Sequence, residues 1–203
     1  MYKKYWMTLL ITVMFFLTAC GNEIENVQSD VNDVKLEGFV QEYDWPLAAF
    51  DAVNQDNEKR TLASYEGKAW IMNMIFTNCT TVCLPMTANM AKLQQSLSEE
   101  NLEVPLVSFS VDPLIDTPEV LKEYGKGYEA DFSNWDMLTG YSEEDIRAIA
   151  KSVKTLAEKP EGTDQVTHST KFFLINQDGI AVKGYDGVNT PYEEIISDLK
   201  AIQ

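Results

Sequence analysis

The sequence predicts an α/β fold with a central mixed sheet flanked by helices, because strand-like and helix-like segments alternate along most of it. The clearest strand is the apolar run 69–76, which ends abruptly at Thr77-Asn78 and is followed by Cys79 and Cys83. A helical pattern begins after Pro85. A strand that presents a close cysteine pair ahead of a helix is typical of thioredoxin-like folds. We therefore expect a thioredoxin-like domain over residues 38–203, with an N-terminal extension.

The N-terminus has the anatomy of an export signal. Lys3-Lys4 precedes an uncharged apolar stretch, 6–19, that is too short for a comfortable membrane span. It ends in Leu17-Thr18-Ala19-Cys20-Gly21, which resembles the bacterial lipobox, in which the cysteine is diacylated and becomes the first residue of the mature protein. We predict a lipoprotein signal peptide over 1–19, lipidation at Cys20, and a location on the extracytoplasmic face of the cell membrane. A retained N-terminal anchor helix is the alternative, and it places the domain on the same side.

The net charge of the chain limits the kinds of partner that it can bind. The 203 residues suit one domain with a leader, and the formal charge of −16 becomes −18 without residues 1–19, which carry Lys3 and Lys4 and no acid. Such an acidic surface repels nucleic acid and anionic lipid heads, so we expect no nucleic-acid partner. Residues 20–37 are polar, acidic and aperiodic, and we expect them to form a flexible tether.

The first half of the domain shows several local signals. Segments 40–43 and 47–51 are short and suggest a hairpin, and Gly67 marks a turn before the central strand. The helix after Pro85 carries an apolar stripe at helical spacing, formed by Met86, Met90, Leu93 and Leu97. Methionine thioethers are soft copper ligands. A helical methionine stripe is more often core, and we assign these residues to the core.

The second half continues the alternation. Residues 104–111 form a second core strand that ends at Asp112-Pro113, and Thr117 then caps a helix with Pro118 at its first position. Another helix starts at Ser142. Strands 171–176 and 180–185 flank a strong hairpin signal, Gln177-Asp178-Gly179. The last helix begins at Thr190-Pro191 and buries Ile195, Ile196, Leu199 and Ile202.

Cys79 and Cys83 are the residues of this chain that are best suited to redox chemistry or metal binding. Two cysteines in an exported domain usually form a structural disulfide. A bridge over three intervening residues closes almost no loop and stabilises little, so a reactive or metal-binding pair fits better. The β-branched residues 80–82 and Pro85 favour a loop or irregular turn over a clean helix. Such a loop can direct both sulfurs at one ion. The cysteine pair could act on another disulfide, on a peroxide or on a metal.

A single histidine, His168, lies just before the strand at 172–176. A lone histidine is usually a surface or satisfied side chain. In the thioredoxin order, however, the segment before this strand lies beside the cysteine loop. Thiolates select soft metals, Cu(I) above all, and an imidazole extends the site to Cu(II) or Zn(II). Cys79, Cys83 and His168 would together complete a compact site.

Three stretches resemble the Sco/SenC family. They are Phe76-Thr77-Asn78-Cys79-Thr80-Thr81-Val82-Cys83, then Phe109-Ser110-Val111-Asp112-Pro113 with Asp116-Thr117-Pro118-Glu119, and finally Val166-Thr167-His168-Ser169-Thr170 leading into Phe172-Phe173-Leu174-Ile175. The resemblance covers roughly residues 38–203, and the lipobox is similar to that of Gram-positive members of the family.

The resemblance implies a membrane-tethered, thioredoxin-like copper chaperone. Members of the family help to assemble the dinuclear copper centre of cytochrome c oxidase subunit II, and other copper carriers or thiol–disulfide oxidoreductases are further expected partners. Carried over by position, Cys79 and Cys83 are the thiolate ligands and the redox-active pair, and His168 is the imidazole ligand. Asp112 matches the aspartate of the family's Val-Asp-Pro motif. It is expected to lie just outside the ligands or only to cap a turn.

One departure from the family concerns geometry. The family usually places proline directly after the second cysteine, whereas Leu84 intervenes here before Pro85.

The expected mechanism is capture of copper by the reduced cysteines and neutral His168 with loss of protons, so that affinity falls in acid. Cu(I) can rest on the two sulfurs alone, while Cu(II) also uses His168 and an oxygen. Oxidation of the cysteine pair to a disulfide then drives release.

Three alternatives compete with the chaperone. A thiol–disulfide reductase that keeps exported cysteines reduced needs Cys79 and Cys83 but not His168. A peroxidase needs a cysteine of low pKa and usually a nearby arginine, and the two arginines, Arg60 and Arg147, are far from the motif in sequence. A binding module with incidental cysteines does not explain their place at a strand exit. We expect a metallochaperone rather than an enzyme, with thiol–disulfide reductase as the next hypothesis.

Overall fold

The computed structural model describes residues 38–79, 83–160, 162–163 and 165–203. The predicted signal peptide, Cys20 and the tether all lie outside the described residues, as do residues 80–82 of the cysteine segment. The strands are β1 (Trp45–Pro46), β2 (Asp51–Val53), β3 (Lys59–Thr61), β4 (Trp70–Ile75), β5 (Leu106–Ser110), β6 (Trp135–Leu138), β7 (Ala157–Glu158), β8 (Thr167–His168), β9 (Lys171–Ile175) and β10 (Ile180–Asp186). The helices are η1 (Leu62–Tyr65), α1 (Cys83–Glu99), α2 (Pro118–Lys126), α3 (Glu143–Ser152) and α4 (Tyr192–Ile202).

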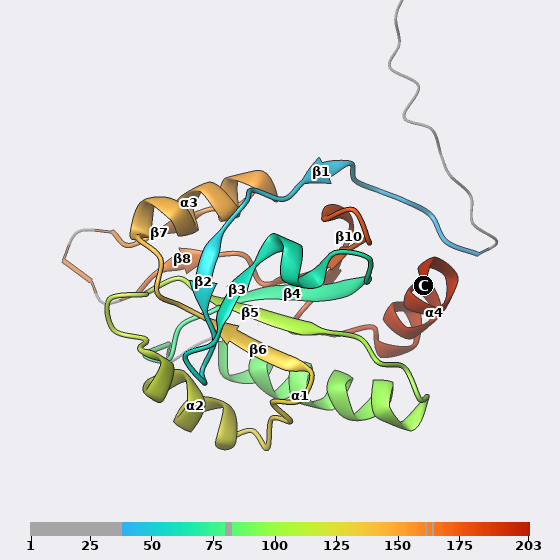
Figure 1. The fold of residues 1–203 in the computed structure, drawn as a ribbon, viewed down its shortest axis with the longest axis horizontal. Coiled ribbons are helices and arrows are strands. Elements are labelled where there is room, and N and C mark those ends of the chain that lie inside the picture. Colours follow the sequence, from blue (N-terminus) through green and yellow to red (C-terminus); the bar gives the residue numbers. More distant parts are fainter. Residues whose placement is uncertain (1–37, 80–82, 161, 164) are drawn as a thin grey trace, which may run out of the picture. The chain divides into compact units, whose positions relative to one another are not determined.

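A six-stranded mixed sheet organises the domain in the order β1-β10-β9-β4-β5-β6 (Figure 1). Strands β4, β5 and β6 are parallel, and β9 runs antiparallel to both β4 and β10. Two small ladders, β2–β3 and β7–β8, lie outside this sheet. The predicted α/β fold with a central mixed sheet is therefore confirmed. Within the described residues, none of the helices combines the length and the apolar character needed to cross a bilayer.

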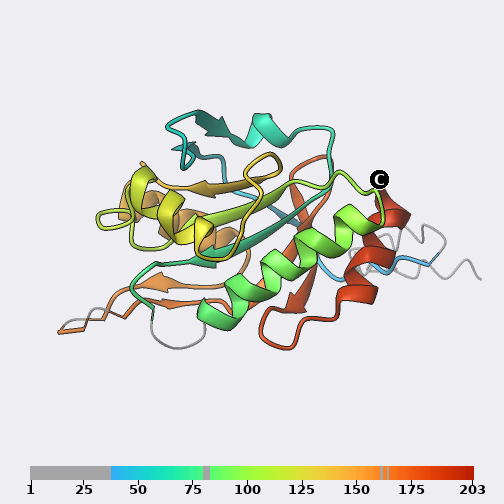
Figure 2. The ribbon, with the colours of Figure 1, turned by 90° about the horizontal axis from the view of Figure 1, so that it is seen from below.

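Both faces of the sheet are covered. All six residues of β4 are buried; Trp70, Met72 and Met74 face one hydrophobic cluster, while Ile71 and Ile75 face the other, as strand alternation requires. Helices α1, α2 and α4 contribute to the second cluster, and Figure 2 shows α1 and α4 along the same face of the sheet. The predicted stripe of α1 is fully buried there, which confirms Met86, Met90, Leu93 and Leu97 as core residues.

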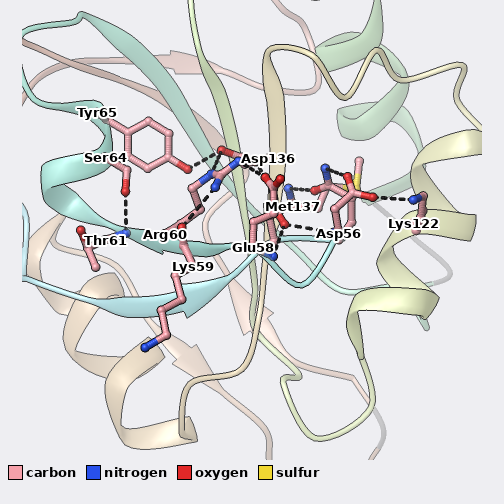
Figure 3. A network of polar contacts seen from close by, with 12 residues as sticks. Asp56, Glu58, Lys59, Arg60, Thr61, Ser64, Tyr65, Lys122, Asp136 and Met137 are labelled. Atoms are coloured by element: carbon pink, nitrogen blue, oxygen red, sulfur yellow. Dashed lines mark hydrogen bonds and ion pairs between the residues drawn. The ribbon is translucent and has the colours of Figure 1, made fainter.

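A polar network fastens the β2–β3 hairpin to β6 (Figure 3). The carboxylate of Asp136 accepts hydrogen bonds from Asn54 Nδ2 at 2.8 Å, from Arg60 Nε at 2.8 Å and from the Tyr65 hydroxyl at 2.7 Å. Burial and the adjacent Asp136 raise the pKa of Tyr65, so this hydroxyl stays a donor at neutral pH. The network holds one edge of the sheet in place.

Several predicted elements are confirmed. Thr117 caps α2, its hydroxyl accepting from the amide of Val120 at 3.4 Å with Pro118 at the first helical position. A capping box at Ser142 starts α3. Strands β9 and β10 form the predicted hairpin, and Gly179 has the positive φ, +75°, that its turn requires. Gly67 likewise turns the chain before β4 with φ +77°.

Other local predictions were wrong. Segments 40–43 and 47–51 do not pair with each other, because β1 pairs with β10 and β2 pairs with β3. No strand was predicted near residue 135, yet β6 forms there and pairs with β5. The loop expected around the second cysteine is partly helical, since Cys83 already belongs to α1. No side chain caps α4, whose N-cap is Pro191, and Ile196 is only partly buried.

Candidate metal centre

The topology brings the two cysteines and the histidine to one edge of the sheet. Cys79 follows the end of β4, and Cys83 is the first residue that the structure describes in α1. His168 ends β8 and comes just before β9. Because β9 runs antiparallel to β4, the start of β9 lies at the edge where β4 ends. This confirms the spatial argument that placed the histidine segment beside the cysteines.

The sulfurs and the imidazole are in contact. Cys83 Sγ lies 3.2 Å from His168 Nε2, and Cys79 Sγ accepts a hydrogen bond from the backbone N–H of Cys83 at 3.4 Å. Both cysteines are buried thiols, with 5% of Cys79 and none of Cys83 exposed. The ring of Phe76 packs edge-on against His168, with centroids 5.6 Å apart. The structure thus brings Cys83 and His168 into contact and places Cys79 beside Cys83, with both cysteines buried and His168 half-buried.

The hydrogen-bond partners of His168 and Cys83 determine which of their atoms carry protons. His168 Nδ1 lies 2.8 Å from the carbonyl oxygen of Ser169, and a carbonyl only accepts, so Nδ1 carries the hydrogen. Burial lowers the pKa of His168, which keeps the ring neutral and leaves a lone pair on Nε2. Burial, and then the hydrogen bond and charge of Cys79, raise the pKa of the Cys83 thiol. The resting contact is therefore a Cys83 S–H that donates to His168 Nε2.

This arrangement has the donors that a soft cation needs. When a cation replaces the shared proton, Cys83 becomes a thiolate and Nε2 keeps its lone pair directed at the same point. The Ser169 carbonyl holds the imidazole orientation by binding its other nitrogen. Among the described residues, no group of three or more His, Cys, Asp and Glu side chains is already arranged to hold a metal ion, so these donors lie close together without forming a complete three-ligand site.

A buried carboxylate lies behind the cysteine segment. Asp116 is fully buried and accepts hydrogen bonds from the hydroxyls of Thr77 and Ser110, both at 2.6 Å, and from the amide of Thr77 at 3.3 Å. Burial raises the pKa of Asp116, although these hydrogen bonds oppose the rise. The negative charge of Asp116 also contributes to the raised pKa of Cys83.

Asp112 lies in the same turn but faces another partner. Its carboxylate forms an ion pair with Lys159 at 3.0 Å, and its amide donates to Ser110 Oγ at 3.1 Å. Its carbonyl accepts from the amides of Ile115 and Asp116, so it also closes the turn. The backbone of Asp112 closes the turn while its carboxylate binds Lys159, so a turn-capping role of the side chain stays a prediction. A role of Asp112 just outside the metal ligands stays a prediction.

Comparison with known proteins decides the family. The SCO1/SenC family profile matches residues 45–203 of this chain. The chain belongs to the SCO1/SenC family. A relative named as a SCO1 protein homolog of Bacillus subtilis (strain 168) is 43% identical over 191 residues, covering 93% of this chain and 92% of the relative.

Solved structures of SCO1/SenC proteins have the same fold. A SCO1/SenC family lipoprotein from Bacillus anthracis str. Ames superposes with a TM-score of 0.75 at 50% identity, over 78% of this chain and 95% of that chain. BsSco, described as a member of the Sco family of cytochrome c oxidase assembly proteins and as having a disulfide switch, gives 0.72 at 47% identity, over 78% and 94%. Copper-bound ScoI of Arabidopsis thaliana gives 0.63 at 27%, over 77% and 97%.

Within this SCO1/SenC chain, sequence reasoning missed two residues of the site. Asp116 was assigned only to the run that starts α2, and Lys159 was not considered. The four-residue spacing of Asp112 and Asp116 after a core strand was the available signal, because a tight turn brings such a pair to one place.

The Leu84 insertion leaves Pro85 in the first turn of α1, where a missing N–H is tolerated.

Proposed function

We propose that this chain is a membrane-anchored copper chaperone that helps to assemble the dinuclear copper centre of cytochrome c oxidase subunit II. Cys79, Cys83 and His168 hold the copper, and Cys20 carries the lipid that keeps the domain at the extracytoplasmic face of the membrane. Support for the cargo comes from copper-bound ScoI, and support for the pathway comes from BsSco. Support for the anchor comes from the lipobox and from the lipoprotein of B. anthracis.

The observation that carries the proposal is the contact between Cys83 Sγ and His168 Nε2 at 3.2 Å. It puts a soft sulfur donor next to a neutral nitrogen donor, and the sulfur of Cys79 lies at the backbone amide of Cys83. Sulfur suits Cu(I), and sulfur with imidazole also suits Cu(II). One site can therefore take copper in either oxidation state.

A thiol–disulfide reductase is the second candidate, and the BsSco disulfide switch favours redox chemistry at the cysteine pair. The raised pKa of Cys83 argues against its use as the attacking thiol, because the thiolate is the nucleophile and little of it forms at neutral pH. Copper does not need a preformed thiolate, since it displaces the proton as it binds. At Cys83, this difference favours copper binding over nucleophilic attack.

The test is an anaerobic titration of the reduced full chain, in detergent, with Cu(II) and with Cu(I). We expect one copper per chain and a sulfur-to-copper charge-transfer band with Cu(II). His168→Ala should abolish or greatly weaken that Cu(II) band and spare most Cu(I) binding, while Cys83→Ser should abolish both. The matched control is Met90→Leu, which changes a fully buried sulfur in the core stripe of α1 and should leave both titrations unchanged.

Acid should weaken the complex. Because the Cys83 pKa is raised, copper must displace a proton throughout the neutral range, and the apparent affinity should rise with pH across that range. A chain that binds no copper at any pH, while its cysteine pair still exchanges with a disulfide, would replace the chaperone with the reductase.

A further inference from the structure

The turn from Asp112 to Asp116 contacts both halves of the site. It is a closed unit, because the amides of Ile115 and Asp116 donate to the carbonyl of Asp112 at 3.0 and 2.9 Å. Its first and last residues are both carboxylates, and both are at least 95% buried. The two side chains bind different parts of the chain, and each of those parts carries one kind of candidate ligand.

Asp116 holds the cysteine arm, which we define as residues 76–79 with Cys83. Thr77 lies two residues before Cys79, and it donates both its hydroxyl, at 2.6 Å, and its amide, at 3.3 Å, to the Asp116 carboxylate. With the hydroxyl of Ser110, these groups make three donors on a fully buried carboxylate, and losing one of them would leave part of the charge unsatisfied. The exit of β4 is thereby fixed in front of Cys79.

Asp112 holds the histidine arm, which we define as the ladder β7–β8 with Lys159. Lys159 follows β7 directly and pairs with Asp112 at 3.0 Å. In that ladder Ala157 of β7 lies opposite His168 of β8. The ion pair is therefore two residues along the chain from Ala157, the register partner of His168. Asp112 is 6% exposed at its side chain, so solvent screens this pair less than a surface pair.

We propose that the turn 112–116 is a clamp that sets the separation between the cysteine arm and the histidine arm, with Asp116 and Asp112 as positioning residues. This inference rests on the proposed function for its purpose, since a separation matters for ligands that share an ion. A shift of about 1 Å in one ligand is enough to impair a site of this kind. The closed turn fixes the backbone positions of the two acids relative to each other, and each carboxylate then anchors its own arm.

The test uses one readout for each arm, and neither readout contains copper. The cysteine arm is monitored by the equilibrium with glutathione, in which the Cys79–Cys83 dithiol gives two electrons and two protons to glutathione disulfide and becomes a disulfide. The histidine arm is monitored by the rate of carbethoxylation of the imidazole with diethyl pyrocarbonate, which reports on His168 alone because the chain has one histidine.

Variants of the full chain address each contact separately. Thr77→Val and Asp116→Asn loosen the cysteine arm, and Thr77→Ser keeps the hydroxyl as the conservative rescue. Lys159→Met and Asp112→Asn loosen the histidine arm. The matched control is Asp198→Asn, which changes a buried carboxylate that binds Lys183 and Tyr185 between α4 and β10. Each arm has two variants, so the loss of one through misfolding leaves the other.

We expect Thr77→Val and Asp116→Asn to change the glutathione equilibrium constant by about threefold or more, with Thr77→Ser close to wild type. Lys159→Met should instead raise the carbethoxylation rate by about threefold or more and leave the glutathione equilibrium within about twofold. Asp112→Asn should act like Lys159→Met. In the copper titration, each loosened arm should weaken Cu(II) binding by about tenfold.

The clamp is overturned if the four variants change the two readouts no more than Asp198→Asn does, or if Thr77→Ser behaves as Thr77→Val. A wild-type chain that binds no copper would refute the proposed function instead. The glutathione and carbethoxylation results would then still decide whether the turn positions the two arms, so the two failures are distinguishable.

Discussion

Two buried carboxylates of this domain are satisfied in different ways. Asp198, on α4, accepts from the ammonium of Lys183 at 2.6 Å and from the hydroxyl of Tyr185 at 2.7 Å. Asp116, behind the cysteines, accepts from two hydroxyls and one amide, which are all neutral. A buried carboxylate beside a cation forms a compensated pair, whereas neutral donors satisfy the oxygens and leave the negative charge in place.

This difference distinguishes the contact between α4 and β10, which contains Asp198, from the candidate metal centre, which lies in front of Asp116. Around Asp198 the ammonium of Lys183 supplies a direct counter-charge, which it also shares with Glu194 at 2.8 Å, and these ion pairs join α4 to β10. Around Asp116 the uncompensated charge favours any cation that arrives at the nearby sulfurs, and it opposes the formation of a second negative charge on Cys83 when no cation is present. The site is therefore better suited to a bound cation than to a bare thiolate.

The largest expected effect comes from removing the cation of the compensated pair. Lys183→Met should lower the free energy of unfolding by about 3 kcal/mol, because Asp198 would stay buried without its counter-charge. Urea unfolding of the reduced chain measures this loss. Below the unfolding transition, the glutathione equilibrium of the cysteines should not change. A loss under about 1 kcal/mol would mean that water reaches Asp198 and that the contrast between the two acids is small.

Removing one hydroxyl from each acid should have a smaller effect. Tyr185→Phe leaves Asp198 with Lys183 and should cost about 1 kcal/mol, while Ser110→Ala leaves Asp116 with only Thr77 and should cost about 2 kcal/mol. The two variants are compared by urea unfolding under the same conditions. If Tyr185→Phe proves the more costly of the two, neutral donors are not what makes burial of Asp116 tolerable.

The pH dependence of Asp116→Asn sharpens the same contrast. The folded pKa of Asp116 is raised, so the folded chain binds this proton more tightly than the unfolded chain does. Wild type should therefore gain stability relative to Asp116→Asn as the pH falls through the raised pKa toward the ordinary aspartate value. Urea unfolding at a series of pH values between neutral and mildly acidic measures the difference. A difference that is constant with pH, or that shrinks in acid, would contradict the raised pKa.

The smallest effect is expected at an exposed pair. Lys122 and Asp56 form an ion pair with side chains 41% and 35% exposed, in the polar network of Figure 3. Lys122→Met should change the free energy of unfolding by only a small fraction of the loss in Lys183→Met, because water already solvates both charges. Unfolding in low and in high salt checks this, and a loss comparable to that of Lys183→Met would show that burial is not the deciding variable.

The sequence predicted what depends on local patterns. The methionine stripe of α1, the Thr117 cap and the hairpin around Gly179 are short-range features, and all three formed as expected. The pairing of β1 with β10 was missed because its partners are more than a hundred residues apart. Strand β6 was missed because its four residues have no clear alternation, and its parallel pairing with β5 supplies the burial.

The residues of the candidate site likewise include some that the sequence predicted and some that it did not. Cys79, Cys83 and His168 were predicted from residue chemistry and from the order of elements, and the structure brings them together. The contact between Asp116 and Thr77 joins residues 39 positions apart, and its partners are ordinary turn-forming and strand-ending residues. Such a contact follows from the folded sheet edge and has no counterpart in a local pattern.

The ladder β7–β8, with only two residue pairs, has a consequence for ligand exchange. It lies outside the six-stranded sheet and carries His168, whereas Cys83 is set in α1 against the core. So short a ladder opens at a lower free energy than the sheet does. In the proposed copper site, the imidazole would be the donor that detaches more easily, and the sulfurs would stay bound. Opening of this ladder would then change the coordination number while the rest of the domain keeps its packing.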